Sequence, residues 1–151
     1  DNQVSEAQDV LRQIVEADSD NESAAVMLAR TFLEADPQLA ATTVESIGLQ
    51  SEKLEEAEAI RDLSDLFIRA EAQHSLLHDP VKDLYLSAIG KARSNDLTGA
   101  LDGFIEVIGK NRYYDDDRSR EACVAIFKLM GEDHRETKAY RQAADDKDSD
   151  S

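Results

Sequence analysis

The spacing of apolar residues is the feature that most limits how this chain can fold. Apolar side chains recur three or four residues apart along most of its length, as in Val10, Leu11 and Ile14 and again in Leu101 and Ile105. This spacing places them on one face of an α-helix. No segment alternates apolar and polar residues for long enough to indicate a strand, and only 2 prolines interrupt the chain. The sequence therefore predicts an all-α protein.

Short polar turns divide the chain into about eight predicted helices, which we expect to run antiparallel to their neighbours. Asn21 can cap the second helix with its side chain. The pairs Asp36-Pro37 and Asp79-Pro80 each have the form of an Asp cap followed by a first-turn proline. The predicted helices cover residues 4–17, 22–34, 37–47, 52–74, 80–94, 97–110, 117–130 and 134–144.

Helix pairs of this length, joined by short turns, are typical of repeat proteins. The tetratricopeptide pattern places Leu-Gly-x2-Tyr on the first helix of a repeat and Ala-x3-Phe on the second, because small residues let the two helices touch. The matches are Leu28-Ala29-x2-Phe32 for a first helix, and Ala7-x3-Leu11, Ala40-x3-Val44 and Ala100-x3-Phe104 for second helices. We therefore predict a tetratricopeptide-like α-solenoid. The alternative is an ordinary helical bundle.

The repeat register also sets the expected domain limits. Residues 4–17 match a second helix, so we expect the chain to start inside a repeat and the natural protein to continue upstream. One helical repeat domain is predicted over residues 1–144. Residues 145–151 contain 4 Asp and 1 Lys with no apolar residue, which predicts a disordered acidic tail.

The charge balance excludes several classes of partner. The chain has 33 acidic and 17 basic side chains, a formal net charge of −16. Such a chain repels phosphate backbones and anionic membrane surfaces, so nucleic acid and membranes are poor partners. Its apolar runs are far shorter than the ~20 residues that cross a bilayer. We therefore expect a soluble, cytoplasmic protein.

From Leu97 onward the chain carries several short motifs in a defined order. They are Gly99-Ala100-Leu101, Asn111-Arg112-Tyr113-Tyr114-Asp115-Asp116-Asp117, Arg120-Glu121-Ala122, Ile126-Phe127, Leu129-Met130-Gly131 and Tyr140-Arg141. This part of the chain resembles the C-terminal tetratricopeptide region of bacterial thioredoxin-fold co-chaperones, the YbbN or chaperedoxin family, and a looser resemblance extends back to residue 4. The resemblance implies an N-terminal thioredoxin domain in the natural chain. It also implies a stress-linked role in binding unfolding clients and passing them to the major chaperones.

The repeat register further predicts a partner-binding groove. In such superhelices the concave surface comes from first-helix positions that face away from the second helix. These positions are Val26, Arg30, Leu33, Lys82, Tyr85 and Ile89. The set is apolar with isolated basic groups, and it lacks the converging basic residues that would clamp an acidic C-terminal peptide. We therefore expect the groove to bind partners other than such peptides.

The residues that could carry chemistry favour structural roles. His74 and His78 have a spacing that can hold a metal on a helix, but no third ligand is evident. Cys123 lies in an apolar stripe and is predicted to be a core cysteine, with a redox role as the alternative. The segment 113–117 lacks the ligand pattern of a calcium loop and is predicted to be a turn whose tyrosines pack and whose Asp residues cap the next helix.

No nucleophile and base form a recognisable catalytic set, so we predict that the chain is not an enzyme and uses no cofactor or metal. The predicted function is a non-catalytic protein-interaction module of a thioredoxin-like co-chaperone. The alternative is a structural scaffold or self-association repeat domain of a larger protein.

Overall fold

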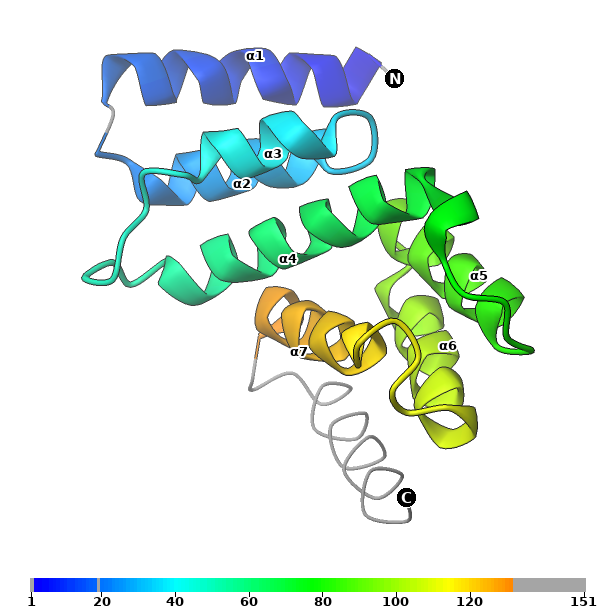
Figure 1. Ribbon diagram of the computed structural model, residues 1–151. Coiled ribbons are helices and arrows are strands. Elements are labelled where there is room, and N and C mark those ends of the chain that lie inside the picture. Colours follow the sequence, from blue (N-terminus) through cyan, green and yellow to red (C-terminus); the bar gives the residue numbers. More distant parts are fainter. Residues whose placement is uncertain (1, 19, 132–151) are drawn as a thin grey trace. The chain divides into compact units, whose positions relative to one another are not determined.

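The computed structural model describes residues 2–18 and 20–131, and all of its regular elements there are helical (Figure 1). The elements are α1 (Asn2–Ala17), α2 (Glu22–Phe32), α3 (Pro37–Thr43), α4 (Leu54–Glu71), the 3₁₀ helix η1 (Gln73–Ser75), α5 (Lys82–Arg93), α6 (Leu97–Lys110) and α7 (Arg118–Met130). None of these helices is both long and apolar enough to cross a bilayer. The predicted helix at 134–144 and the predicted tail at 145–151 lie outside the described residues.

The chain divides into two compact units, Asp1–Asp65 and Leu66–Ser151, with the division inside α4. In the first unit α1 packs on α2 and α2 on α3, whereas in the second α5 packs on α6 and α6 on α7. Helices that are neighbours in the sequence are thus neighbours in space, which is the packing expected of repeats. A single repeat domain over residues 1–144 stays a prediction.

Side-chain caps begin several of the helices. The side chain of Asn21 accepts a hydrogen bond from the backbone N–H of Ala24 at 3.0 Å. Asp36 accepts from the N–H of Leu39 at 3.1 Å, and Pro37 occupies the first turn of α3. These bonds satisfy N–H groups that have no partner inside a helix. The predicted starts of α2 and α3 are therefore confirmed.

The predicted start of α5 at residue 80 is wrong, because the helix begins at Lys82. The carboxylate of Asp79 accepts a hydrogen bond from the N–H of Val81 at 2.9 Å, which forms a turn around Pro80. The other carboxylate oxygen of Asp79 accepts from the side-chain amide of Asn111, also at 2.9 Å. Both bonds hold Asp79 in the turn and delay the helix.

Helix α3 ends earlier than predicted because α4 binds the carbonyl groups that follow it. The guanidinium group of Arg61 donates to the carbonyl oxygens of Val44 at 2.7 Å and Ile47 at 3.0 Å. Carbonyl groups at the C-terminal end of a helix need such partners, and here they come from a distant segment of the first unit. Ser64 of α4 also contacts α3, at its start, where the Ser64 hydroxyl donates to the carbonyl oxygen of Pro37.

A close contact between α5 and α6 organises the core of the second unit. Gly103 of α6 faces Ala88 of α5, and a Cβ atom placed on Gly103 would lie 2.8 Å from the Cβ of Ala88. The motif residues Ala100 and Phe104 have no exposed surface. Phe104 packs edge to face on Tyr85, with 6.2 Å between the ring centroids. Small residues at the crossing thus let the aromatic rings interlock.

Substituting Gly103 with Ala should destabilise the protein, because the new methyl group has no space against Ala88. Overpacking costs about 1–3 kcal/mol, which outweighs the gain in helix propensity of about 1 kcal/mol. We expect the free energy of unfolding, measured by urea denaturation, to fall by about 1 kcal/mol.

The matched control is Gly90→Ala in α5, where no atom lies within 4 Å of an added Cβ. This variant should be more stable than the wild type by about 0.5–1 kcal/mol. Equal effects of the two substitutions would contradict the close helix contact.

Candidate partner-binding site

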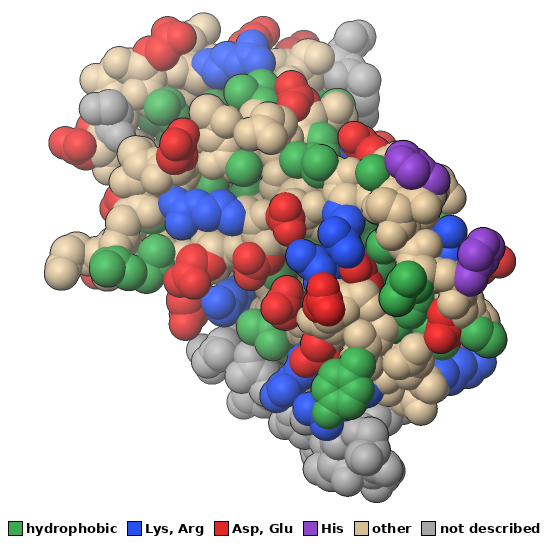
Figure 2. Space-filling model, in the orientation of Figure 1, with side chains coloured by type: hydrophobic (Ala, Val, Ile, Leu, Met, Phe, Trp, Pro, Cys, Tyr) green, Lys and Arg blue, Asp and Glu red, His purple; other side chains and the backbone are tan. Residues whose placement is uncertain are grey.

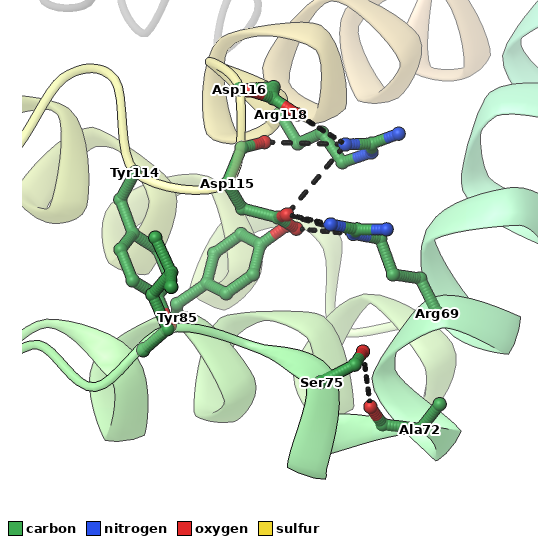
Figure 3. A network of polar contacts seen from close by, with 9 residues as sticks. Arg69, Ala72, Ser75, Tyr85, Tyr114, Asp115, Asp116 and Arg118 are labelled. Atoms are coloured by element: carbon green, nitrogen blue, oxygen red, sulfur yellow. Dashed lines mark hydrogen bonds and ion pairs between the residues drawn. The ribbon is translucent and has the colours of Figure 1, made fainter.

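The loop between α6 and α7 carries a buried carboxylate with several polar partners, that of Asp115 (Figure 3). Its side chain is 3% exposed. The Nε atom of Arg69 donates to both carboxylate oxygens, at 2.8 and 2.9 Å. The hydroxyl of Tyr85 donates to Oδ2 at 2.6 Å, and Nη1 of Arg118 lies 3.7 Å from Oδ1. One carboxylate therefore joins the end of α4 to α5 and α7.

The surroundings of Asp115 keep it charged and keep Tyr85 protonated. Burial alone would raise the pKa of Asp115, but the hydrogen bonds from Arg69 and Tyr85 and the charges of Arg69 and Arg118 hold the pKa below its ordinary value. Burial and the hydrogen bond to Asp115 raise the pKa of Tyr85 well above its usual range. At neutral pH the cluster therefore contains one carboxylate, two guanidinium groups and one neutral phenol.

The backbone around Asp115 has an unusual conformation. Asp115, Asp116 and Asp117 have φ angles of 55, 59 and 65°, in the left-handed region. Residues other than glycine rarely adopt this region, and a left-handed helical turn costs about 1–2 kcal/mol per residue. The contacts of the Asp115 carboxylate with Arg69 and Tyr85 offset part of this cost.

The roles predicted for segment 113–117 are partly wrong. Asp117 occupies the cap position of α7, but its side chain makes no capping hydrogen bond. Tyr114 is buried, and its hydroxyl donates to the carbonyl oxygen of Leu77 at 2.6 Å. Tyr113 is 69% exposed instead of packed. The left-handed backbone accounts for these differences, because it turns Asp115 inward and replaces the regular capped start that we predicted.

A pocket of about 270 Å³ lies beside this loop, within the second unit. One side is formed by residues 75–79, between η1 and α5, and the other by loop residues 111 and 113–116. Arg69 of α4 also lines it. The sequence does not predict this pocket, because its two walls are distant in the chain and neither carries a ligand-binding motif.

The residues of the predicted groove fall into both units. The first three, on α2 and at its end, belong to the first unit, and the last three, on α5, belong to the second. Most of the side chains are buried and two retain access to solvent. The buried side chains are those of Val26, Leu33, Tyr85 and Ile89. Arg30 is exposed, and Lys82 is partly exposed. Direct contact with a partner is thus open to Arg30 and Lys82, while the groove itself stays a prediction.

The chain's one cysteine has the surroundings of a core residue. Cys123 is 1% exposed, and burial raises the pKa of its thiol to about 12. Little nucleophilic thiolate therefore forms near neutral pH. Within residues 2–18 and 20–131, no group of three or more His, Cys, Asp or Glu side chains is arranged to hold a metal ion, and this includes the surroundings of His74 and His78.

A sequence profile described as tetratricopeptide repeat matches residues 56–143, more than half of the chain. The chain belongs to the tetratricopeptide repeat family. The predicted fold class, an all-α tetratricopeptide-like α-solenoid, is confirmed by this match and by the helices of the described residues. No curated protein and no solved structure matches the chain.

Members of the tetratricopeptide repeat family bind other proteins through stacked helix pairs. The chain is accordingly an interaction module, and its functional surfaces are those that a protein partner can reach. Within the second unit, the pocket beside the Asp115 loop is accessible to a partner, because Leu77 and Tyr113 on its walls are 77% and 69% exposed.

Replacing Asp115 with Asn should destabilise the second unit, because Arg69 and Tyr85 lose a charged acceptor. Hydrogen bonds to charged groups contribute about 1.5–3 kcal/mol. The side chain of Arg69 is 36% exposed, so solvent screening reduces its share. We expect the free energy of unfolding to fall by about 1–2 kcal/mol in urea denaturation. Asp116→Asn, in the same loop but with a side chain 90% exposed, is the control and should change little.

The stabilising effect of Asp115 should depend on pH. Its pKa in the folded state lies below the ordinary value of 3.8, so its contribution is complete above that value and is lost as the pH falls through the folded pKa. The difference in unfolding free energy between the wild type and Asp115→Asn should be constant from about pH 7 to pH 5 and shrink below about pH 4. A difference that is unchanged at about pH 3 would contradict the charged network.

Proposed function

We propose that this chain is the client- or chaperone-binding part of a cytoplasmic, thioredoxin-like co-chaperone that acts under stress. Two observations support the proposal. The first, which carries the proposal, is membership of the tetratricopeptide repeat family, because protein binding is the general role of that family. The second is that the motifs from Leu97 onward resemble the YbbN or chaperedoxin family, which implies a role in stress and a thioredoxin domain in the natural chain.

A client would contact the large apolar side chains that are left exposed in both units. These residues are Val4, Val10, Ile14, Met27, Leu39, Leu49, Ile68, Leu77, Tyr113 and Val124. Figure 2 shows hydrophobic side chains as separate patches among acidic and basic ones. Each of these side chains could bury apolar surface against the apolar segments that an unfolding protein exposes.

The negative charge of the chain fits the same role. A formal net charge of −16 keeps a complex with an apolar client in solution, because complexes of like charge repel one another. It also favours neutral and basic segments over acidic ones. The module would thus bind apolar segments while it prevents them from assembling.

The proposal is tested by the heat-induced aggregation of a thermolabile enzyme, followed by light scattering. The 151-residue chain at an equimolar ratio should slow the rise in scattering, because its apolar patches cover the segments that the client exposes. The variant Leu49→Ser with Leu77→Ser should slow it less, since these side chains are 88% and 77% exposed.

A matched control replaces two exposed polar residues, Lys91 and Asp102, with Ser. This control should protect the client as well as the wild type does. Aggregation that proceeds unchanged in the presence of excess chain would reject the co-chaperone role. Concentration-dependent oligomers in light scattering, without protection of the client, would instead support a self-associating scaffold.

A further inference from the structure

The pocket beside the Asp115 loop is lined by both large apolar side chains and carboxylates. Leu77 and Tyr113, on its two walls, are 77% and 69% exposed. Leu76 and Tyr114, which also line it, are 6% and 5% exposed. Large apolar side chains next to a concave site are typical of a protein-docking surface.

The size of the pocket limits what can enter it. Its volume of about 270 Å³ is below the 300–1,000 Å³ of pockets that hold whole small molecules. It therefore suits one long side chain of a partner, whose neighbouring residues remain outside on the rim.

The charges that line the pocket indicate the sign of that side chain. Three carboxylates, those of Asp79, Asp115 and Asp116, line it, and two guanidinium groups face them: Arg69, which also lines the pocket, and Arg118, which pairs with Asp115 and Asp116. Arg69 is already engaged, because its guanidinium group holds the carboxylate of Asp115. Asp116 is 90% exposed and forms an ion pair with Arg118 at 3.7 Å, so two guanidinium groups balance two of the three carboxylates. The pocket thus has excess negative charge.

Asp79 supplies a fixed acceptor in this pocket. One of its carboxylate oxygens accepts from the N–H of Val81 and the other from the side-chain amide of Asn111, each at 2.9 Å. These two donors are neutral, so they orient the carboxylate without cancelling its charge. Each oxygen has a further lone pair that can accept from a cation.

We propose that this pocket binds the side chain of a Lys or Arg in an extended partner segment, with apolar neighbours on both sides of it. The cationic head lies between Asp79 and Asp116, and its methylene stem packs on Leu76 and Tyr114. The apolar neighbours contact Leu77 and Tyr113. The inference rests on the proposed role in protein binding and specifies the chemistry of the bound segment.

Charge complementarity favours this occupant over others. An acidic segment or a nucleic acid would meet the excess of carboxylates in the pocket and the net charge of −16 on the chain. A purely apolar segment would cover the carboxylate of Asp79, whose two hydrogen-bond donors are neutral, without supplying a counter-charge, which is costly. A basic side chain between apolar residues can pair with the carboxylates of the pocket, while its apolar neighbours contact Leu77 and Tyr113.

The test measures the binding of fluorescein-labelled nonapeptides to the 151-residue chain by fluorescence anisotropy. The probe has Leu-Lys-Leu at its centre, and two control peptides replace this with Leu-Glu-Leu or Gly-Lys-Gly. We expect the probe to bind about tenfold more tightly than either control. Raising the salt concentration should weaken its binding, because part of the attraction is ionic.

Variants locate the binding in the pocket. Asp79→Asn, Asp116→Asn and Leu77→Ser should each weaken binding of the probe about three- to fivefold. Asp102→Asn removes the same charge from an exposed position on α6 and should leave binding unchanged. Far-ultraviolet circular dichroism of each variant controls for folding. Asp116→Asn keeps the test decisive if Asp79→Asn disturbs the turn before α5.

Two results would overturn the inference. One is equal binding of the Leu-Lys-Leu and Leu-Glu-Leu peptides. The other is a loss of affinity in Asp102→Asn that matches the loss in Asp79→Asn and Asp116→Asn, since this would reflect net charge alone.

The aggregation assay separates this inference from the co-chaperone role. If the probe binds in the pocket but the chain does not protect a client, the pocket inference is upheld and the co-chaperone role is rejected. If the chain protects a client but binds all peptides equally, the co-chaperone role is upheld and the pocket inference is rejected.

Discussion

The ion pair between Asp115 and Arg69 is the interaction on which the second unit most depends. It holds a loop with three consecutive left-handed residues, and it joins the end of α4 to the start of α7. Tyr85 adds a hydrogen bond from α5 and places its ring between those of Phe104 and Tyr114. The buried carboxylate of Asp115 therefore fixes the conformation of the α6–α7 loop, which forms one wall of the pocket.

Small residues and polar groups stabilise different parts of the fold. In the first unit, Arg61 binds carbonyl groups that follow α3. In the second, the contact of Gly103 with Ala88 brings α5 and α6 together and leaves the aromatic rings to fill the space around it. Close helix contacts depend on small residues, whereas the turns between helices depend on hydrogen bonds, because their backbone groups have no partner within a helix.

Features that depend on residues close together in the sequence could be predicted, whereas contacts between residues far apart in the sequence could not. Asn21 and Asp36 cap their helices as expected, because a cap bonds to a backbone group three residues away in the sequence. The partner of Asp115 is 46 residues away, and nothing in the run of aspartates indicates which of them turns inward. The start of α5 was misplaced for a similar reason, since Asn111 helps to hold Asp79 in its turn.

By itself, the sequence determined the helical fold class, the repeat family, the starts of α2, α3 and α6, and the strong negative charge. These follow from the period of the apolar residues, from caps and from composition, which all act over a few residues or over the whole chain. The tertiary structure decided that Tyr85 is buried while Tyr113 is exposed, and that Asp79 and Asp116 line one pocket. Periodicity tells which face of a helix is apolar, but only the neighbours that pack against it decide what stays accessible to a partner.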